Sequence, residues 1–417
     1  MNLRYTFVII LSFIVSQTFA QFTLSGELRP RTEFRNGYKT LNFENADAAF
    51  ATSQRTRLNF NYATEFYSFY VSLQDVRVWG DVSQLNVSDK NGLAIHQAWG
   101  LVNFKEMKLK AGRQEIVYDD HRIFGNVGWA TQARSHDALV LKFGKTFNLD
   151  IGLAFNQDYE KLSGTIYTTS NNYKALQYAW FHKTLNNFST SFLFLNNGLQ
   201  YIDIIDSENS ETRYSQTIGT HLKYKFSDAL NASSNIYYQF GKDVFSKDLD
   251  AYLIGMNLGY KVSENWNLGL GFEVQSGNAY NDDLSTNHAF TPFYGTNHKF
   301  NGFMDYFYVG NHMNSTGLID VFASASTKIG EKSNLSLYLH NFTSHAKIAE
   351  NIDKQLGTEI DIVYNYKYTK DVTIGAGYSQ MFASEGMEVL KNVPNPSNAN
   401  NWAWVMLTIN PTLFTSK

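Results

Sequence analysis

The sequence predicts an all-β fold, a transmembrane antiparallel β-barrel of about 18 strands with short periplasmic turns and long extracellular loops. Three observations lead to this prediction. Apolar residues recur with a period of two rather than the helical period of about 3.6. Short and long connections alternate along the chain. Aromatic residues make up 16% of the 417 residues, yet no apolar run after residue 20 reaches the roughly 20 residues that a membrane-spanning helix needs.

The first element is a predicted secretory signal peptide at residues 1–20, MNLRYTFVIILSFIVSQTFA. It has one early cation, Arg4, then an apolar core, and small residues before Gln21. A membrane anchor is the weaker alternative, because the apolar run is too short. We therefore expect residues 21–417 to form a barrel in the bacterial outer membrane. The chain has no cysteine, which excludes disulfides and thiolate metal sites.

Alternation defines the strands. In WNLGLGFEVQ, residues 266–275, the Trp, Leu, Phe and Val side chains share one face, and the Asn, Gly, Glu and Gln residues share the other. Similar segments predict 18 strands, at residues 22–35, 52–63, 66–78, 93–104, 107–116, 133–143, 149–156, 173–183, 188–196, 213–225, 229–241, 251–262, 266–275, 316–328, 334–343, 355–368, 372–383 and 401–414.

Eight short turns and nine long loops alternate between these strands, which is typical of outer-membrane barrels. The apolar, aromatic face suits lipid, and the polar face suits a wet lumen. At about 18 strands, side chains cannot fill the interior, so an aqueous channel is expected. A soluble propeller is the competing fold, but it would need a sequence signature repeated in each blade, which the chain lacks.

Cations concentrate on the first strands, since nine of the ten arginines after residue 20 lie between Arg29 and Arg134. Arginine keeps its charge and binds carboxylates through a bidentate fork, so such a wall favours an anionic solute. The simpler interpretation is that these are only the solvated side chains of a wide lumen. Alternation places seven cations and two carboxylates inward on the first, second and fifth strands: Glu27, Arg29, Arg31, Glu33, Arg35, Arg55, Arg57, Lys108 and Lys110.

Several carboxylates could face this cationic wall. They would either brace the arginines in ion pairs or form a separate negative wall, and both arrangements fit the sequence. These carboxylates are Asp75, Asp137, Glu273, Glu359 and Asp361.

Four blocks, in order, resemble the alginate export porin family of outer-membrane barrels. The first is LQDVRVWG at residues 73–80, and the second is AGRQEIVYDDHRIFGNVGWATQARSHDALVLKF at residues 111–143. The third is FTPFYGTNHKFNGFMDYF at residues 290–307, and the fourth is LGTEIDI at residues 356–362. Together the blocks span most of the mature chain.

The resemblance implies an 18-stranded barrel with an arginine-lined constriction that passes a uronate polysaccharide. By alternation alone Arg77 and Arg113 fall on the lipid side, so their inward placement rests on the resemblance. The third block lies in a loop at residues 276–315, which we expect to fold into the mouth as a gate or a sugar-contact surface. Carried over by position, the constriction residues are Asp75, Arg77, Arg113, Arg134, Asp137, Glu359 and Asp361.

These features predict a passive porin for anionic solutes or polysaccharide, with no enzyme activity, metal or cofactor. Expected partners are outer-membrane lipid, the solute, and the barrel-insertion machinery, which would read the aromatic last strand ending at Phe414. Proteins of envelope polysaccharide synthesis or degradation are candidate further partners. A net charge of −3 gives no pull toward nucleic acid. The alternatives are a barrel that anchors or binds within a polysaccharide-handling complex, and a hydrolase, which the absence of a nucleophile elbow disfavours.

Overall fold

One antiparallel sheet closes on itself in the computed structural model, which describes residues 20–416 except 44, 87, 170–171, 204–209, 284, 394–395 and 398. The first strand, β1 (Gln21–Asn36), pairs on one side with β2 (Ala49–Ala63) and on the other with β19 (Asn400–Ile409) and β20 (Thr412–Thr415). Closure leaves no sheet edge exposed to lipid. The predicted signal peptide, apart from residue 20, lies outside the described residues.

Every barrel strand pairs antiparallel with its neighbours in the chain, and the predicted number of strands, 18, is confirmed. Two short elements explain why the sheet has 20 labelled strands: β14 (Thr286–Asn287) lies in a loop, and β20 continues β19. The other strands are β3 (Tyr67–Val78), β4 (Ala94–Asn103), β5 (Met107–Gln114), β6 (His136–Gly144), β7 (Asn148–Phe155), β8 (Ala175–Leu185), β9 (Phe188–Tyr201), β10 (Glu211–Lys225), β11 (Leu230–Lys242), β12 (Asp248–Lys261), β13 (Trp266–Gln275), β15 (Leu318–Ile329), β16 (Ser333–Thr343), β17 (Gln355–Lys367) and β18 (Val372–Ala383).

Helical segments are short and lie in the long loops: η2 (Asn297–Lys299), α1 (Val309–His312) and α2 (Glu385–Lys391). Within the described part of the chain, no helix is long and apolar enough to cross a membrane.

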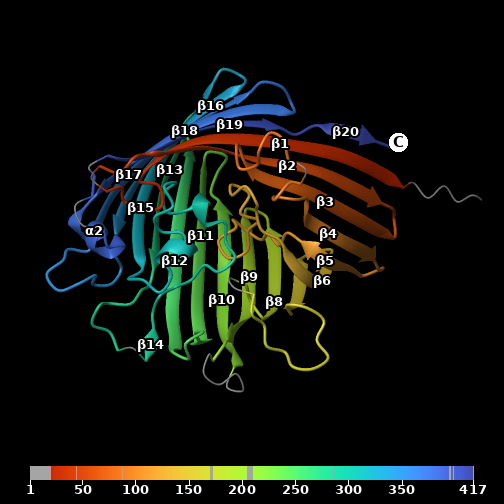
Figure 1. Ribbon diagram of the computed structural model, residues 1–417, viewed down its shortest axis with the longest axis horizontal. Helices are drawn as coiled ribbons and strands as arrows, with labels where there is room; N and C mark the ends of the chain where they lie inside the picture. The colour runs from red at the N-terminus through yellow and green to blue at the C-terminus, as the bar shows by residue number, and fades with distance from the viewer. Residues whose placement is uncertain are drawn as a thin grey trace, which may run out of the picture.

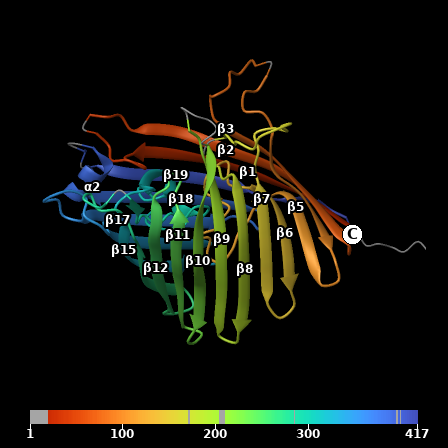
Figure 2. The ribbon, with the colours of Figure 1, turned by 90° about the horizontal axis from the view of Figure 1, so that it is seen from below.

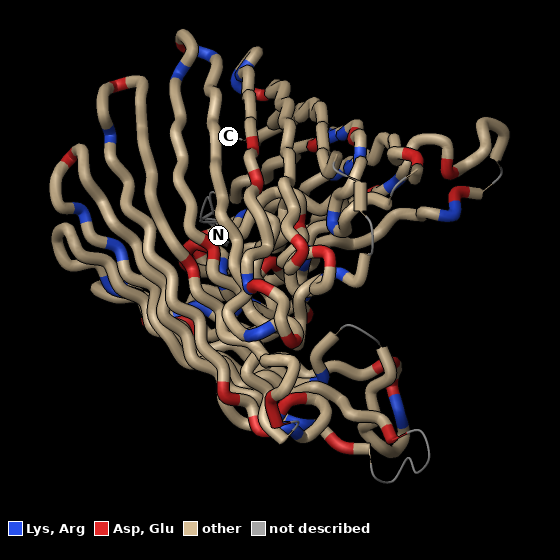
Figure 3. The backbone as a smooth tube through the Cα atoms, turned by 90° about the vertical axis from the view of Figure 1, so that its left-hand side faces the viewer, with Lys and Arg blue, Asp and Glu red and all other residues tan. Residues whose placement is uncertain are grey.

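The strands are joined by short turns at one end of the barrel, the turn end, and by long loops at the other, the loop end. Figure 2 shows the hairpin turns of the green and yellow strands gathered at the turn end. By the rule for outer-membrane barrels, the turn end faces the periplasm. Many charged residues lie at the turns between strands and around the segments folded into the barrel (Figure 3).

Most predicted strand bounds differ from the structure by a few residues, as at β9, which ends at Tyr201 rather than at residue 196, and two of the differences have a clear physical reason. The sixth strand starts at His136 rather than at residue 133, because Arg134 donates its main-chain N–H to Asn126 and belongs to the preceding loop. The last strand is interrupted at Pro411, which has no N–H to offer a ladder. The pairing of β20 with β1 accordingly shifts register between Leu24 and Ser25.

Two long connections fold into the barrel and together form what we call the inner plug (Figure 1). Its first segment is residues 115–135, between β5 and β6, and its second is residues 276–315, between β13 and β15. The main chains of the segments bond to each other, with Gly125 N–H donating to Tyr294 O at 2.8 Å. The contact requires glycine, since a Cβ on Gly125 would lie 2.3 Å from the Thr296 hydroxyl oxygen.

Apolar side chains seat the plug against the wall in two clusters. One joins Phe124 and Phe290 of the plug to Tyr178 and Leu195 of the wall. The other joins plug residues such as Met304 and Tyr306 to Phe342 and Trp402, among other wall residues. The core of this molecule therefore lies inside the barrel, between plug and wall.

Candidate functional site

Five arginines line the inward face of β1 and β2: Arg29, Arg31, Arg35, Arg55 and Arg57, which we call the arginine wall. The strands pair in a register that sets Arg29 directly opposite Arg55. Carboxylates of the same strands accompany them, with Arg55 Nε 2.6 Å from Glu27 and Arg31 Nε 3.4 Å from Glu33. Arginines thus outnumber the carboxylates on this wall.

The arginine wall grips the first plug segment by its main-chain carbonyl groups. Arg29 donates to Gly128 O at 2.6 Å, and Arg31 donates to Trp129 O at 2.7 Å. Arg29 also reaches the Trp129 and Ala130 carbonyls, and Arg55 reaches those of Gly128 and Ala130 at 3.3 Å. Arg31 and Arg55 are only 6% and 5% exposed. Arg31 Nε, 3.4 Å from Glu33, is buried without a hydrogen-bond partner among the described residues.

The other two arginines of the wall are less tightly held. Arg57 donates to the Gln74 side chain at 2.8 Å and lies 4.0 Å from Glu115. Arg35 pairs with Glu33 at 2.8 Å, and its side chain is 44% exposed. Arg35 is therefore the arginine of this wall that is most open to a solute.

Lysines line the inward face nearer the turn end. Lys108 is exposed, and Lys110 lies 4.1 Å over the ring of Trp99. The neighbouring Lys142 forms an ion pair with Asp150. These residues lie on the same face as Gln114, whose neighbour on β6, His136, contacts the plug.

Three further inward lysines were not among the predicted site residues: Lys223, Lys328 and Lys367. Each lies an even number of residues from a buried inward residue of its own strand, namely His221, Asp320 or Asp361. All three are exposed, and no ion pair involves them within the described ranges. The alternation of β10, β15 and β17 is the signal that could have found them.

Four buried carboxylates form an acidic wall on the far strands: Glu273, Asp320, Glu359 and Asp361. Glu273 pairs with Arg122 of the plug, and Asp320 accepts from His340 at 2.9 Å. Glu359 accepts the Met304 N–H of the plug at 2.8 Å. Among the described residues, neither Asp361 carboxylate oxygen has a hydrogen-bond partner with good geometry.

Arg134 belongs to the plug rather than to a strand. Its guanidinium donates to Gly295 O at 3.1 Å and so ties the two plug segments together. Burial lowers the pKa of Arg134 from its ordinary value. Arg122, part of the same sequence block but not a predicted site residue, bonds to Asn297 and Asn301 in the second segment.

Four residues that the resemblance assigned to the constriction lie on the outward face: Asp75, Arg77, Arg113 and Asp137. Arg77 bonds to Asp75 and Asp89, and Arg113 pairs with Asp137 at 3.0 Å, with exposed fractions of 45% and 60%. The reason is unbroken alternation. The adjacent residues Gln74 and His136 contact the plug, and no register shift separates β2 from β3 or β5 from β6.

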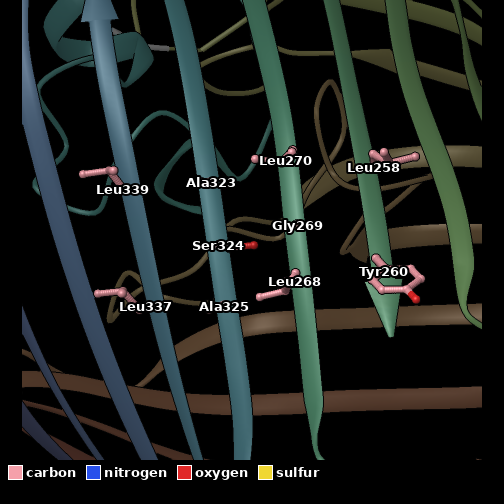
Figure 4. Close-up of a pocket in the computed structure, with 10 residues that line it drawn as sticks. All are labelled: Leu258, Tyr260, Leu268, Gly269, Leu270, Ala323, Ser324, Ala325, Leu337 and Leu339. Atoms are coloured by element: carbon pink, nitrogen blue, oxygen red, sulfur yellow. The ribbon is translucent and has the colours of Figure 1, made fainter. Parts of the chain in front are cut away.

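A shallow apolar hollow of about 520 Å³ lies on the outer surface (Figure 4). Leucines of β12, β13 and β16 line it around a floor of small residues on β13 and β15. It faces the lipid side and is separate from the lumen. Its lining is Leu258, Tyr260, Leu268, Gly269, Leu270, Ala323, Ser324, Ala325, Leu337 and Leu339. Elsewhere in the described chain, no group of three His, Asp or Glu side chains is arranged to hold a metal ion.

Solved structures similar to this fold include outer-membrane porins of Acinetobacter baumannii and Pseudomonas aeruginosa. OccAB4 of Acinetobacter baumannii is 13% identical, with 96% of this chain and 99% of that chain covered and a TM-score of 0.64. OpdK of Pseudomonas aeruginosa is 8% identical, with 95% and 99% covered and a TM-score of 0.62. OpdQ of Pseudomonas aeruginosa is 13% identical, with 94% and 98% covered and a TM-score of 0.60. At these identities the likeness shows the fold alone.

No curated protein sequence matches the chain. A family model described as alginate export matches residues 20–389, which include all four sequence blocks and both plug segments. The chain therefore belongs to the alginate export family of porin-like outer-membrane β-barrels.

Proposed function

We propose that the protein is a passive outer-membrane channel that favours anionic or carbohydrate solutes. The observation that carries this proposal is the set of inward cations in the turn-end half of the lumen. Lys108, Lys223, Lys328 and Lys367 are exposed there, and among the described residues no carboxylate pairs with them. Asp150, an inward carboxylate of β7, is already paired with Lys142.

Charge and hydrogen bonding both support this proposal. Low-dielectric walls of one sign focus the field and raise the local concentration of ions of opposite charge. Inward asparagines lie near these lysines. Asn334 of β16 and Asn365 of β17, for example, pair directly across the two strands. Amides both donate and accept hydrogen bonds, as hydroxylated solutes require.

Ion selectivity in planar bilayers tests the proposal. The purified wild type in a salt gradient should give a reversal potential on the anion side. Replacing Lys108, Lys223 and Lys328 with Glu should remove or reverse that preference, since six units of charge change on the lumen wall. Lys90→Glu on an exposed outer loop is the matched control and should leave selectivity as in the wild type. A cation-selective wild type, or an unaltered triple variant, would contradict the assignment.

A second candidate is a barrel that anchors or binds within an envelope polysaccharide-handling complex. The observation that favours it is the packed plug, which is held against the inner face of the wall by two separate apolar clusters. A wild type with negligible conductance that co-purifies stoichiometrically with another envelope protein would support this candidate over the channel.

A further inference from the structure

The two charged walls hold the plug by opposite kinds of contact: the arginine wall donates hydrogen bonds to the plug, and the acidic wall accepts them from it. Carbonyl oxygens of Gly128, Trp129 and Ala130 face the guanidinium groups of the arginine wall. On the far side, Glu359 accepts a hydrogen bond from the Met304 N–H of the plug, and Glu273 forms an ion pair with Arg122 of the plug. Donors thus meet acceptors at both walls, with the plug clamped between them.

The hold at the arginine wall depends on side chains. Within the described residues, no main-chain hydrogen bond joins residues 117–134 to a barrel strand, and those that the segment makes run within itself or to the second segment. The segment can therefore leave the wall without breaking the sheet ladder. Near residues 128–130, such a movement would break the six bonds from Arg29, Arg31 and Arg55 to three carbonyls, and the bond from Gln74 to Gln132 O beside them. The other end of the segment is held separately, by Arg122 on Glu273 and by Asp119, which accepts from Trp180 and Ser191.

Of the three arginines, Arg55 pairs with Glu27 and Arg31 with Glu33, whereas no ion pair among the described residues involves Arg29. A carbonyl oxygen accepts a hydrogen bond but carries no net charge, so it does not neutralise a guanidinium. Arg29 and Arg55 stand directly opposite each other on paired strands, where like charges destabilise a sheet. Glu27 and Glu33 are the wall carboxylates that offset this crowding. Repulsion between neighbouring guanidinium groups therefore weakens the hold of the arginine wall on the plug, which favours release of the plug.

We propose that the inner plug is a movable gate and that Arg29, Arg31 and Arg55 are its latch. Displacing residues 128–130 from these guanidinium groups swings the first plug segment off the wall and widens the lumen. Selectivity and gating then belong to different residues, the lysines near the turn end and the buried arginines. A latch of this kind goes beyond a passive channel, and cysteine labelling can detect it without any measurement of transport.

The chain has no cysteine, so a designed disulfide can lock the plug to the wall. The hydroxyl oxygens of Thr131 and Ser53 lie 3.4 Å apart across the plug–wall contact, near enough for a bridge. In the double variant Ser53→Cys and Thr131→Cys, oxidation should hold the channel at its lowest conductance and abolish opening events. Reduction should restore them. Thr131→Cys alone, oxidised in the same way, is the control. Equal conductance before and after reduction would show that the plug does not gate.

Cysteine labelling follows the latch directly. With Thr131→Cys as the single thiol, Arg29→Gln combined with Arg31→Gln should speed maleimide labelling by at least about tenfold, the factor that loss of one modest contact produces. Arg213→Gln is the matched control, because Arg213 also donates to a loop carbonyl, that of Val244, away from the plug. Heat-modifiable migration on gels verifies that each barrel is folded.

The outcomes separate the two proposals. Unchanged labelling in the folded double arginine variant would overturn the latch. Faster labelling without any conductance would support the latch and contradict the channel. If the arginine variants fail to fold, the disulfide experiment decides, because it keeps every arginine in place.

Discussion

Trp129 of the first plug segment contacts both the barrel wall and the second plug segment. The Arg31 guanidinium lies 4.1 Å over its ring, and the His298 ring stacks on it at 4.6 Å. Trp404 meets it edge to face at 5.0 Å. Its carbonyl is also an acceptor for the arginine wall. One side chain thus joins the first plug segment, the second plug segment and β19.

Trp129→Ala should loosen the plug while leaving the barrel closed. Trp129 is half-buried, so its removal should cost less than the roughly 3–5 kcal/mol that a fully buried Trp costs. Limited proteolysis should then cut within residues 115–135, while heat-modifiable migration stays as in the wild type. Trp79→Ala is the control, because Trp79 is 59% exposed on an outer loop. Protection of the Trp129 variant equal to that of the wild type would disprove this role.

Gly295 is the second residue on which the plug depends. A Cβ there would lie 2.3 Å from the Arg122 carbonyl oxygen, which is main chain and cannot rotate away. Gly295→Ala should therefore separate the two plug segments, seen as faster hydrogen exchange at Gly125 and Thr296, whose N–H groups bond across the contact. Gly128→Ala, whose new Cβ meets only the Asn126 side chain at 3.5 Å, should exchange as slowly as the wild type.

At the scale of elements, helix α2 acts as a clasp on the second plug segment. Lys391 at its end donates to Tyr306 O at 2.5 Å and to Asn311 O at 3.0 Å. Burial lowers the pKa of Lys391 to about 7. Burial, with repulsion from Lys391, lowers the pKa of His312 to about 3. Charge on either group therefore opposes docking.

The clasp should tighten as pH rises. Between pH of about 7 and 10.5 the released lysine keeps a proton that the docked lysine loses, so the released state binds more protons and docking strengthens with pH. Between about 3 and 6.5 the same holds for His312, so acid weakens docking. Hydrogen exchange in residues 303–313, corrected for intrinsic rates, should slow as pH rises. Lys391→Met should lose the dependence above pH 7, and an unchanged slope would rule out Lys391 as its source.

The strands and the plug differ in how far the sequence predicts them. Period-two alternation predicts the strands and the inward face of β1 and β2, because lipid and water impose opposite polarity on alternate residues. It also assigns Arg77 and Arg113 outward, where the structure has them. The length of the loop at residues 276–315 marks it as a functional segment. The contacts of the plug with the wall are missed, because partners such as Arg122 of the first plug segment and Glu273 of β13 are 151 residues apart and no local pattern links them.

At the scale of the whole molecule, the barrel and its second plug segment are separable. The segment leaves and re-enters the wall at nearly one point, since Asn278 N–H donates to Ser315 O at 2.9 Å. Its removal would leave the pairing of β13 with β15 in place.

Replacing residues 279–314 with a short Gly-Ser turn should leave a closed barrel of larger conductance. The ladders between the wall strands remain, although the short pairing of β14 with β12 is lost. Apolar cluster residues such as Leu318 and Phe342 become wet, so thermal stability should fall. Single-channel recordings and thermal gel-shift midpoints measure the two effects. A variant that no longer folds would show instead that the second plug segment is part of the folding core.

The sequence by itself determines the barrel, the number of strands, the family and the polarity of each strand face, because these follow from local alternation and from blocks of neighbouring residues. Only the tertiary structure decides what the inward charges do. The arginines that alternation aims into the lumen meet carbonyl groups about 100 positions along the chain, as from Arg29 to Trp129. Hydrogen bonds to main-chain carbonyls leave no trace in residue type, so a gripped arginine and a free one look alike in the sequence.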